Sequence, residues 1–317
     1  DIVTKIEVVD GSEVLYSLNM SQLEALHFYK TGKMPAIFPS EWAGGTQRHN
    51  VLLMFGRYLW DREYAFNSKA FTNPQLKITM NKAAIRAAGA DGFAAGDNIK
   101  LTPTAKVFED IPAPGAFLMA KQIENFVSAA SGEKRIELPT DYTYRMLLNR
   151  FWLQAYDINE IITDLKLTCD TDKFIPINRK VQQLDAAAFA MFGAGRLKHD
   201  VFVYNDQVRR LIFNKEPDCR IWDYRANDAY IAGIAYQWSS EIKIALITHA
   251  GATVGANTQL TMVEEGHAPH ATLPIFFGRP GMPEDWFDPK VYKKIELVLT
   301  QAVVSAVCEI AAEQVRP

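Results

Sequence analysis

The chain has 317 residues, of which 48% are hydrophobic and 22% are charged. This composition is that of an ordinary globular protein and excludes a disordered chain, a collagen-like fibre and a coiled coil. The net charge is −3, so we expect no direct contact with nucleic acid, which requires clustered basic residues. A chain of this length exceeds what one ordinary core serves, so length alone predicts two domains.

The first segment of the chain is predicted to form two strands and a helix. Residues 2–19 alternate apolar and polar positions, break at Asp10-Gly11 and then resume as a second extended run. Residues 20–31 change to helical spacing, and Gly32 stands where a helix end favours glycine.

The remainder of the first half contains further runs that favour strands. They lie at 51–59, 76–80 and 99–109, and clusters of Gly, Pro and Asp separate them. A short helix is predicted at 116–130. A long extended stretch at 142–156 follows Leu138-Pro139.

The second half repeats this order of features. Residues 161–178 match residues 2–19 at a constant offset of 159, so that Ile2 corresponds to Ile161 and Asn19 to Asn178. A second helix is predicted at 179–193, and Leu273-Pro274 precedes another extended stretch at 294–310. The ordered recurrence predicts a duplication, with one domain at 1–158 and the other at 159–317.

The fold class follows from the number of strands. The second half adds strand-like runs at 201–204, 208–213, 229–238, 241–249 and 259–263. Many strands with turn signals between them, and few helices, predict an all-β protein: two tandem eight-stranded jelly rolls, which are β-sandwiches, with short helical inserts. Two packed sheets would cover each other's apolar faces.

Three cysteines, Cys169, Cys219 and Cys308, are odd in number and widely spaced, so we expect buried, reduced thiols. The longest stretch without Asp, Glu, Lys or Arg, at 244–263, is rich in Thr, Asn, Gln and Gly. It is therefore not predicted to cross a bilayer.

The sequence predicts no catalytic residue, no cofactor site and no metal site. It contains no Gly-x-x-x-x-Gly-Lys loop, no Gly-x-Ser-x-Gly turn and no His-Glu-x-x-His helix motif. The best metal candidate is the segment with Glu264, Glu265, His267 and His270, which only faintly resembles a cupin motif. We favour a polar loop before a strand there. A bicupin-type metalloenzyme and a two-domain carbohydrate-binding protein remain the alternatives.

The strand pair and helix near the start of each half, at 2–31 and 161–193, give the chain a resemblance to a known family. It resembles the double jelly-roll major capsid proteins of the adenovirus-hexon lineage, in particular those of tailless icosahedral phages with an internal membrane. The resemblance spans nearly the whole chain.

This resemblance implies a structural protein and not an enzyme. It implies homotrimeric capsomers of pseudo-hexagonal outline that tile the icosahedral shell of a virion and assemble in the host cytoplasm. The implied partners are the chain itself, neighbouring capsomers, penton or minor capsid proteins, and an internal membrane vesicle. No direct contact with nucleic acid and no cofactor are implied.

Subunit contacts are predicted in two loops rich in Pro, Gly and aromatic residues, at 35–48 and 273–289. Aromatic residues and Arg are typical of the centres of interfaces. An alternative remains open, in which these aromatic residues pack on their own domain. The candidate interface residues are Trp42, Phe276, Phe277, Arg279, Trp286 and Phe287.

Overall fold

A computed structural model of the chain describes residues 3–35, 37–38, 48–81, 100–109, 111–204, 207–222, 230–248 and 257–317. Strands dominate this part of the chain. No helix in it is both long and apolar enough to cross a bilayer. The elements in chain order are β1 (Val3–Asp10), β2 (Glu13–Leu18), α1 (Met20–Thr31), β3 (Ile37–Phe38), β4 (Arg48–His49), η1 (Ser68–Ala70), β5 (Pro74–Met80), β6 (Phe117–Val127), β7 (Gly132–Glu137), β8 (Tyr144–Trp152), α3 (Ile158–Ile161), β9 (Ile162–Cys169), β10 (Phe174–Lys180), α4 (Val181–Phe192), β11 (Gly195–Tyr204), β12 (Gln207–Arg210), β13 (Phe213–Trp222), β14 (Tyr230–Trp238), β15 (Glu241–Thr248), β16 (Asn257–Pro269), β17 (Thr272–Phe276), η2 (Pro283–Asp285), η3 (Pro289–Val291), β18 (Ile295–Gln301) and β19 (Val307–Arg316).

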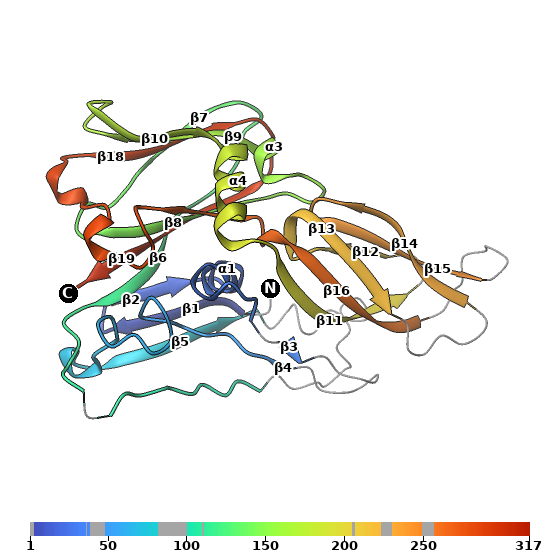
Figure 1. Ribbon diagram of the computed structural model, residues 1–317, viewed down its shortest axis with the longest axis horizontal. Helices are drawn as coiled ribbons and strands as arrows, with labels where there is room; N and C mark the ends of the chain where they lie inside the picture. The colour runs from blue at the N-terminus through green and yellow to red at the C-terminus, as the bar shows by residue number, and fades with distance from the viewer. Residues whose placement is uncertain are drawn as a thin grey trace.

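The larger of two sandwiches contains a seven-stranded sheet, in the order β17-β8-β19-β6-β2-β1-β5, and a four-stranded sheet, β10-β9-β18-β7. Figure 1 shows the four-stranded sheet as the upper layer. Leu165 and Leu297 from the four-stranded sheet pack against Leu147, Phe151 and Ile310 from the seven-stranded sheet in one buried cluster. This apolar contact holds the two layers together.

The opposite face of the seven-stranded sheet is covered by α1 and by the irregular chain that contains Phe55 and Phe66. Leu23, Leu26 and Phe28 of α1 share a buried cluster with Tyr16 of β2 and Met146 of β8. Phe55 and Phe66 pack on the same cluster and stack on each other, with ring centroids 4.8 Å apart. The sheet is therefore buried on both faces over part of its width.

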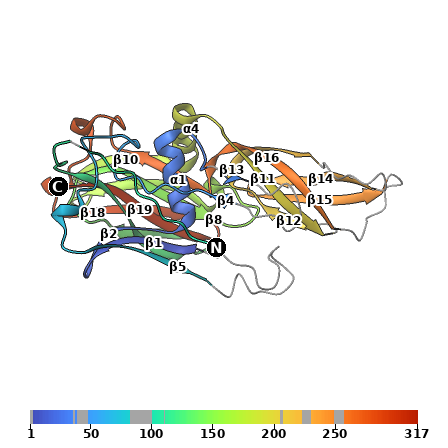
Figure 2. The same ribbon diagram turned by 90° about the horizontal axis from the view of Figure 1, so that it is seen from below.

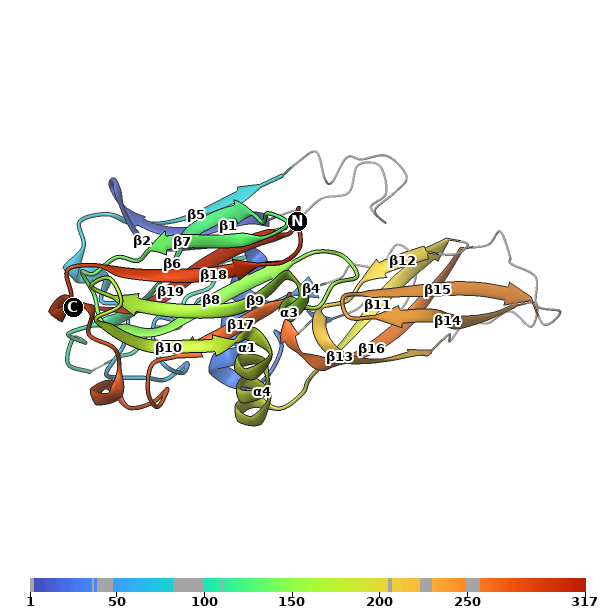
Figure 3. The same cartoon turned by 90° about the horizontal axis from the view of Figure 1, so that it is seen from above.

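A smaller sandwich projects from one end of the molecule (Figures 2 and 3). It contains two three-stranded sheets, β11-β16-β13 and β12-β15-β14. Its core includes Cys219, Ile242, Ile244, Leu260 and Met262. The all-β class, the sandwich architecture and the short helical inserts predicted from the sequence are thus confirmed.

Strand pairing crosses the boundary predicted between residues 158 and 159. Strand β7 pairs with β18, and β19 lies between β6 and β8. The halves 1–158 and 159–317 therefore share two sheets, and the predicted boundary falls inside α3. The similarity between the two halves of the sequence predicts the hairpin and helix of each half. Which strands pair depends on contacts between residues that are far apart in the chain.

The local part of the predicted repeat is present in both halves. Each copy is an antiparallel hairpin followed by a helix: β1, β2 and α1 in the first, β9, β10 and α4 in the second. Gly32 and Gly193 follow the helices with φ values of 70° and 68°, in the left-handed region that favours glycine. The neighbours differ, because β1 pairs with β5 whereas β9 pairs with β18.

One predicted helix is wrong. Residues 116–130 contain strand β6, which lies between β2 and β19 in the seven-stranded sheet. Phe117, Leu118, Met119 and Ala120 are all buried, because the sheet is covered on both faces. A strand covered on both faces has a continuous apolar run and loses the alternation that would distinguish it from a helix.

Other expected extended runs are shorter or are not strands. The segment 51–59 contains no strand and packs on the core as irregular chain, with Phe55 O accepting a hydrogen bond from Leu118 N. No strand forms over 100–109. The stretch 294–310 is divided between β18 and β19, and Ser305 in the break has a φ of 70°. The three cysteines are buried free thiols, as predicted.

Helix α1 has a complete capping box, which gives a first prediction. The Asn19 side chain accepts a hydrogen bond from Gln22 N, and Gln22 Oε1 accepts one from Asn19 N. We expect Asn19→Ala to lower the free energy of unfolding by about 1–2 kcal/mol. The matched control is Lys180→Ala, because the Lys180 side chain makes no capping bond at the start of α4. Urea titration of both variants would check this, and equal small losses would contradict it.

Candidate functional site

The aromatic residues predicted as contacts at 273–289 lie where β17 leaves the seven-stranded sheet. The Phe277 ring stacks on Phe287 with centroids 5.1 Å apart and meets Tyr144 edge-on at 5.9 Å. Phe276 lies 5.5 Å from Phe192 of α4. These rings therefore pack against their own chain.

Trp286 also packs within the chain. Its side chain is buried, its ring lies 5.5 Å from Tyr64, and its Nε1 donates to Arg279 O. Arg279 itself is exposed and forms an ion pair with Asp285. The packing of the aromatic residues agrees with the alternative that the sequence left open, and a role in subunit contacts stays a prediction. Trp42 lies outside the described residues.

A shallow hollow of about 470 Å³ lies beside these rings and the edge strand β10. Phe174 of β10 stacks on Tyr292 at 5.8 Å, and Tyr292 stacks on Phe287 at 5.7 Å. Phe174 is 46% exposed, so the outer end of this aromatic row meets solvent. Asp285 and Asp288 add two carboxylates to the lining.

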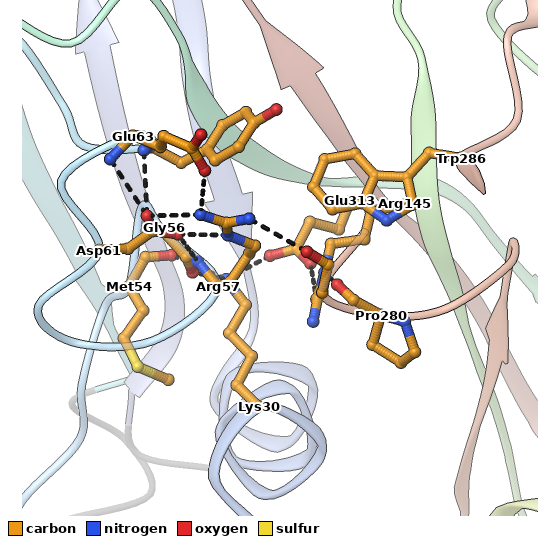
Figure 4. A network of polar contacts seen from close by, with 12 residues as sticks. Lys30, Met54, Gly56, Arg57, Asp61, Glu63, Arg145, Pro280, Trp286 and Glu313 are labelled. Carbon is orange, nitrogen blue, oxygen red and sulfur yellow. Dashed lines mark hydrogen bonds and ion pairs between the residues drawn. The ribbon is translucent and has the colours of Figure 1, made fainter. Parts of the chain in front are cut away.

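Figure 4 shows a buried ionic network that includes the backbone of Pro280 in the 273–289 loop. Glu313 of β19 forms ion pairs with both Lys30 of α1 and Arg145 of β8, and all three side chains are at most 3% exposed. Arg145 Nε also donates to Pro280 O at 2.9 Å. Burial lowers the pKa of Lys30, and the nearby Glu313 carboxylate partly opposes that shift. One carboxylate thus joins α1 to two central strands of the sheet.

The same network continues into two loops. Lys30 Nζ donates to Met54 O and Gly56 O, at 3.0 and 2.9 Å. Arg57 pairs with Asp61 and donates to Gly281 O at 3.1 Å. These bonds hold the loop that contains Met54 and Gly56 and the loop that contains Pro280 and Gly281 against the sheet and against each other.

A second cluster of buried charge lies where α1 meets β8 and β16. Glu309 Oε2 accepts from Asn19 Nδ2 at 2.9 Å and pairs with Arg150 at 3.0 Å. Glu24 pairs with His270 at 2.6 Å and with His49 at 3.1 Å. Burial alone would raise the pKa of Glu24, but the bonds from the two histidines outweigh it and hold that pKa at about 2.

The polar side chains of the candidate metal-binding segment contact different partners. His267 pairs with Asp185 of α4 at 3.1 Å, whereas His270 pairs with Glu24 of α1. Glu264 is fully buried and accepts a hydrogen bond from Phe213 N. In the part of the chain that the structure describes, no three His, Cys, Asp or Glu side chains form a metal-binding group.

The preferred alternative for that segment, a polar loop before a strand, is wrong. Residues Glu264 to Pro269 belong to β16, and β17 begins at Thr272. The polar side chains at Glu264 and His267 resemble a loop in sequence, yet both are buried. His267 contacts Asp185 of α4, and Glu264 accepts a hydrogen bond from Phe213 N of β13.

The ionic network has no counterpart among the sites predicted from the sequence. Glu313 and Arg145 are 168 residues apart, and each lies in a strand that is buried over most of its length. A charged residue at a buried strand position is the signal that could have indicated a paired charge, but it names no partner.

No protein-family model matches the chain, and no curated protein matches it. The crystal structure of the STIV MCP matches with a TM-score of 0.47 and 14% identity, over 98% of this chain and 78% of that one. The crystal structure of the major capsid protein P2 from bacteriophage PM2 matches with a TM-score of 0.19 and 10% identity, over 63% of this chain and 98% of that one.

Both identities and both TM-scores are low. Neither match transfers a function to this chain.

Proposed function

We propose that the protein is a structural subunit of a virus capsid. In this proposal the chain forms homotrimeric capsomers of pseudo-hexagonal outline, which tile an icosahedral shell and contact neighbouring capsomers. The virion is its location, after assembly in the host cytoplasm. Its further partners are penton or minor capsid proteins and an internal membrane vesicle.

The observation that carries the proposal is the architecture of two β-sandwich bodies in one chain. In this proposal the covered sheets give a rigid block, and the function lies in the contacts between the outer surfaces of neighbouring copies. The buried charges fit this role. Glu313, Glu309 and Glu24 each join different elements and so hold the block in shape.

The test is the mass and shape of the particle in solution. Light scattering after size exclusion should give three times the chain mass of 35.7 kDa. Negative-stain images should then show a hexagonal outline, and at high protein concentration these trimers should form sheets or shells. A monodisperse monomer at every concentration would contradict the proposal, and so would a dimer.

The metalloenzyme alternative is tested in the same preparation. Elemental analysis should find less than one bound transition metal per chain. Stoichiometric metal that is lost on His267→Ala would favour that alternative instead.

A further inference from the structure

The seven-stranded sheet contains a gap one strand wide where β2 ends. Strand β2 stops at Leu18, because the chain turns there into α1 (Figure 1). Its neighbour β1 pairs with it only as far as Ile6, and its other neighbour, β6, pairs with it at Lys121. Both neighbours continue beyond these residues. We call the space between their continuations the slot.

The two walls of the slot are strand edges. One wall is residues 3–5 of β1, whose other side pairs with β5. The second wall is residues 122–125 of β6, whose other side pairs with β19. In the part of the chain that the structure describes, neither wall has a strand partner on the side that faces the slot. A strand edge presents backbone N–H and C=O groups to a further strand.

The slot is an open space in the sheet. A hollow of about 360 Å³ is lined by the residues that a continuation of β2 would touch: Thr4, Lys5, Ser17, Asn19, residues 122–125 and Glu309. Because a strand rises roughly 3.3 Å per residue, walls of this length flank about three or four residues. The slot therefore has space for a short extended segment with backbone hydrogen bonds on both sides.

The shape of the slot selects the kind of segment. It is closed at one end by Ser17 and Asn19, because β2 occupies the same line in the sheet. Its open end lies towards Asn125, which is exposed. An internal segment of a chain continues in both directions, whereas a chain end can stop at Asn19. The occupant that fits is therefore a chain end.

The carboxylate of Glu309 favours an amino end over a carboxyl end. Its Oε2 reaches the closed end of the slot and accepts from Asn19, Gln22 and Arg150. Its Oε1 accepts no hydrogen bond from the residues that the structure describes. An amino group can donate to this oxygen, whereas a terminal carboxylate would meet a like charge. Arg150 offsets the charge of Glu309, so the amino end is held by a hydrogen bond and not by net charge.

We propose that the slot binds the amino-terminal end of a partner protein as a short strand between β1 and β6. The inserted residues run in the direction of β2, antiparallel to β1 and parallel to β6. The described strands of a second copy are already paired in its own sheets, so the partner is a different polypeptide. The slot is part of the sheet itself and does not depend on the capsid role.

A synthetic peptide tests the slot. The probe is a hexapeptide of alternating threonine and valine with a free amino end and a dye on its carboxyl end, and fluorescence anisotropy measures its binding. Successive N–H groups of a strand point to opposite sides, so N-methylation of the second peptide residue removes a bond to one wall and N-methylation of the third a bond to the other. Each should weaken binding about tenfold, and so should acetylation of the amino end.

A loss from only one of the two methyl groups would indicate that the peptide adds to an open edge, such as β5 or β10, and would overturn the proposal. The absence of any binding by the unmodified probe would overturn it as well.

Two variants of the chain show whether the probe enters the slot. Asn125 and Val127 are exposed on the same face of β6, but only Asn125 lines the slot. Asn125→Trp should therefore weaken probe binding about tenfold by covering the slot, whereas the matched control Val127→Trp should leave it unchanged. Thermal unfolding of both variants should match that of the wild type, because both side chains are exposed. Equal probe binding by the two variants would contradict the proposal.

Hydrogen exchange locates the inserted strand. With the probe bound, backbone amides in residues 3–6 and 121–125 should exchange more slowly, whereas those of β10 should be unaffected. Slower exchange in β10 or at the outer edge of β5, without a change at the slot, would overturn the proposal. In the chain alone the slot amides should exchange at the same rate at low and high protein concentration. Protection that appears on concentrating the chain alone would assign the slot to a second copy and contradict the proposed partner.

Discussion

Replacing Glu313 with Gln is expected to lower the free energy of unfolding by about 3–5 kcal/mol. The change leaves Lys30 and Arg145 as buried cations without a carboxylate, although both stay in place in α1 and β8. Removing one member of a buried ion pair is costly because the other charge has lost its water and gains no substitute. Urea titration at neutral pH, followed by tryptophan fluorescence, measures the loss.

Glu63→Gln is the matched control for this prediction. Glu63 also pairs with an arginine of the same network, Arg57, but its side chain is 70% exposed. The expected loss is below about 1 kcal/mol, because water screens an exposed pair and Asp61 still binds Arg57. Adding Lys30→Met to Glu313→Gln should recover part of the loss by removing one uncompensated charge. A loss below about 1 kcal/mol for Glu313→Gln would show that the network does not hold the sheet.

Glu264 is expected to make stability fall as pH rises. Burial raises the pKa of this carboxyl from the ordinary 4.5 to about 8. Between these values the folded chain keeps a proton that the unfolded chain has released. The free energy of unfolding therefore falls by up to about 1.4 kcal/mol per pH unit. The contribution is complete below pH 4.5 and is lost as pH rises through about 8.

Glu264→Gln should remove this dependence, because the amide is neutral at every pH. We expect the variant to gain stability relative to the wild type as pH rises, by about 2 kcal/mol or more at alkaline pH. Urea titrations at about pH 5, about pH 7 and about pH 9 would show it. Glu265→Gln changes the exposed neighbour and should leave the wild-type slope. A slope that is the same in Glu264→Gln and in the wild type would contradict this origin.

Local sequence signals predicted the two hairpins and the helix that follows each of them. The β1–β2 hairpin, α1 and their counterparts β9, β10 and α4 lie where alternation, a turn and a terminal glycine placed them. Strand β6 was predicted as a helix because Phe117 to Ala120 are all buried and carry no alternation. A strand shows apolar and polar residues in alternation only where one of its faces is buried and the other is exposed. This signal is lost in β6, where both faces of the sheet are covered.

The aromatic loop at 273–289 shows the same limit at the candidate site. Its composition predicted contacts between subunits, with packing on the same domain as the alternative, and Phe277 and Trp286 are buried within this chain. Composition could not say whether the neighbours belong to the same chain. The structure gives Tyr144 and Tyr64 of this chain as those neighbours.

By itself the sequence determined the all-β class, the repeated hairpin and helix, and the burial of the three cysteines, because these depend on residues close together in the chain. Only the tertiary structure decided that β18 and β19 enter the sheets of the first half, and that Glu313 meets Lys30 and Arg145. Such pairings are chosen by the packing of whole sheets. Their energy depends on contacts across more than a hundred residues, which no local pattern encodes.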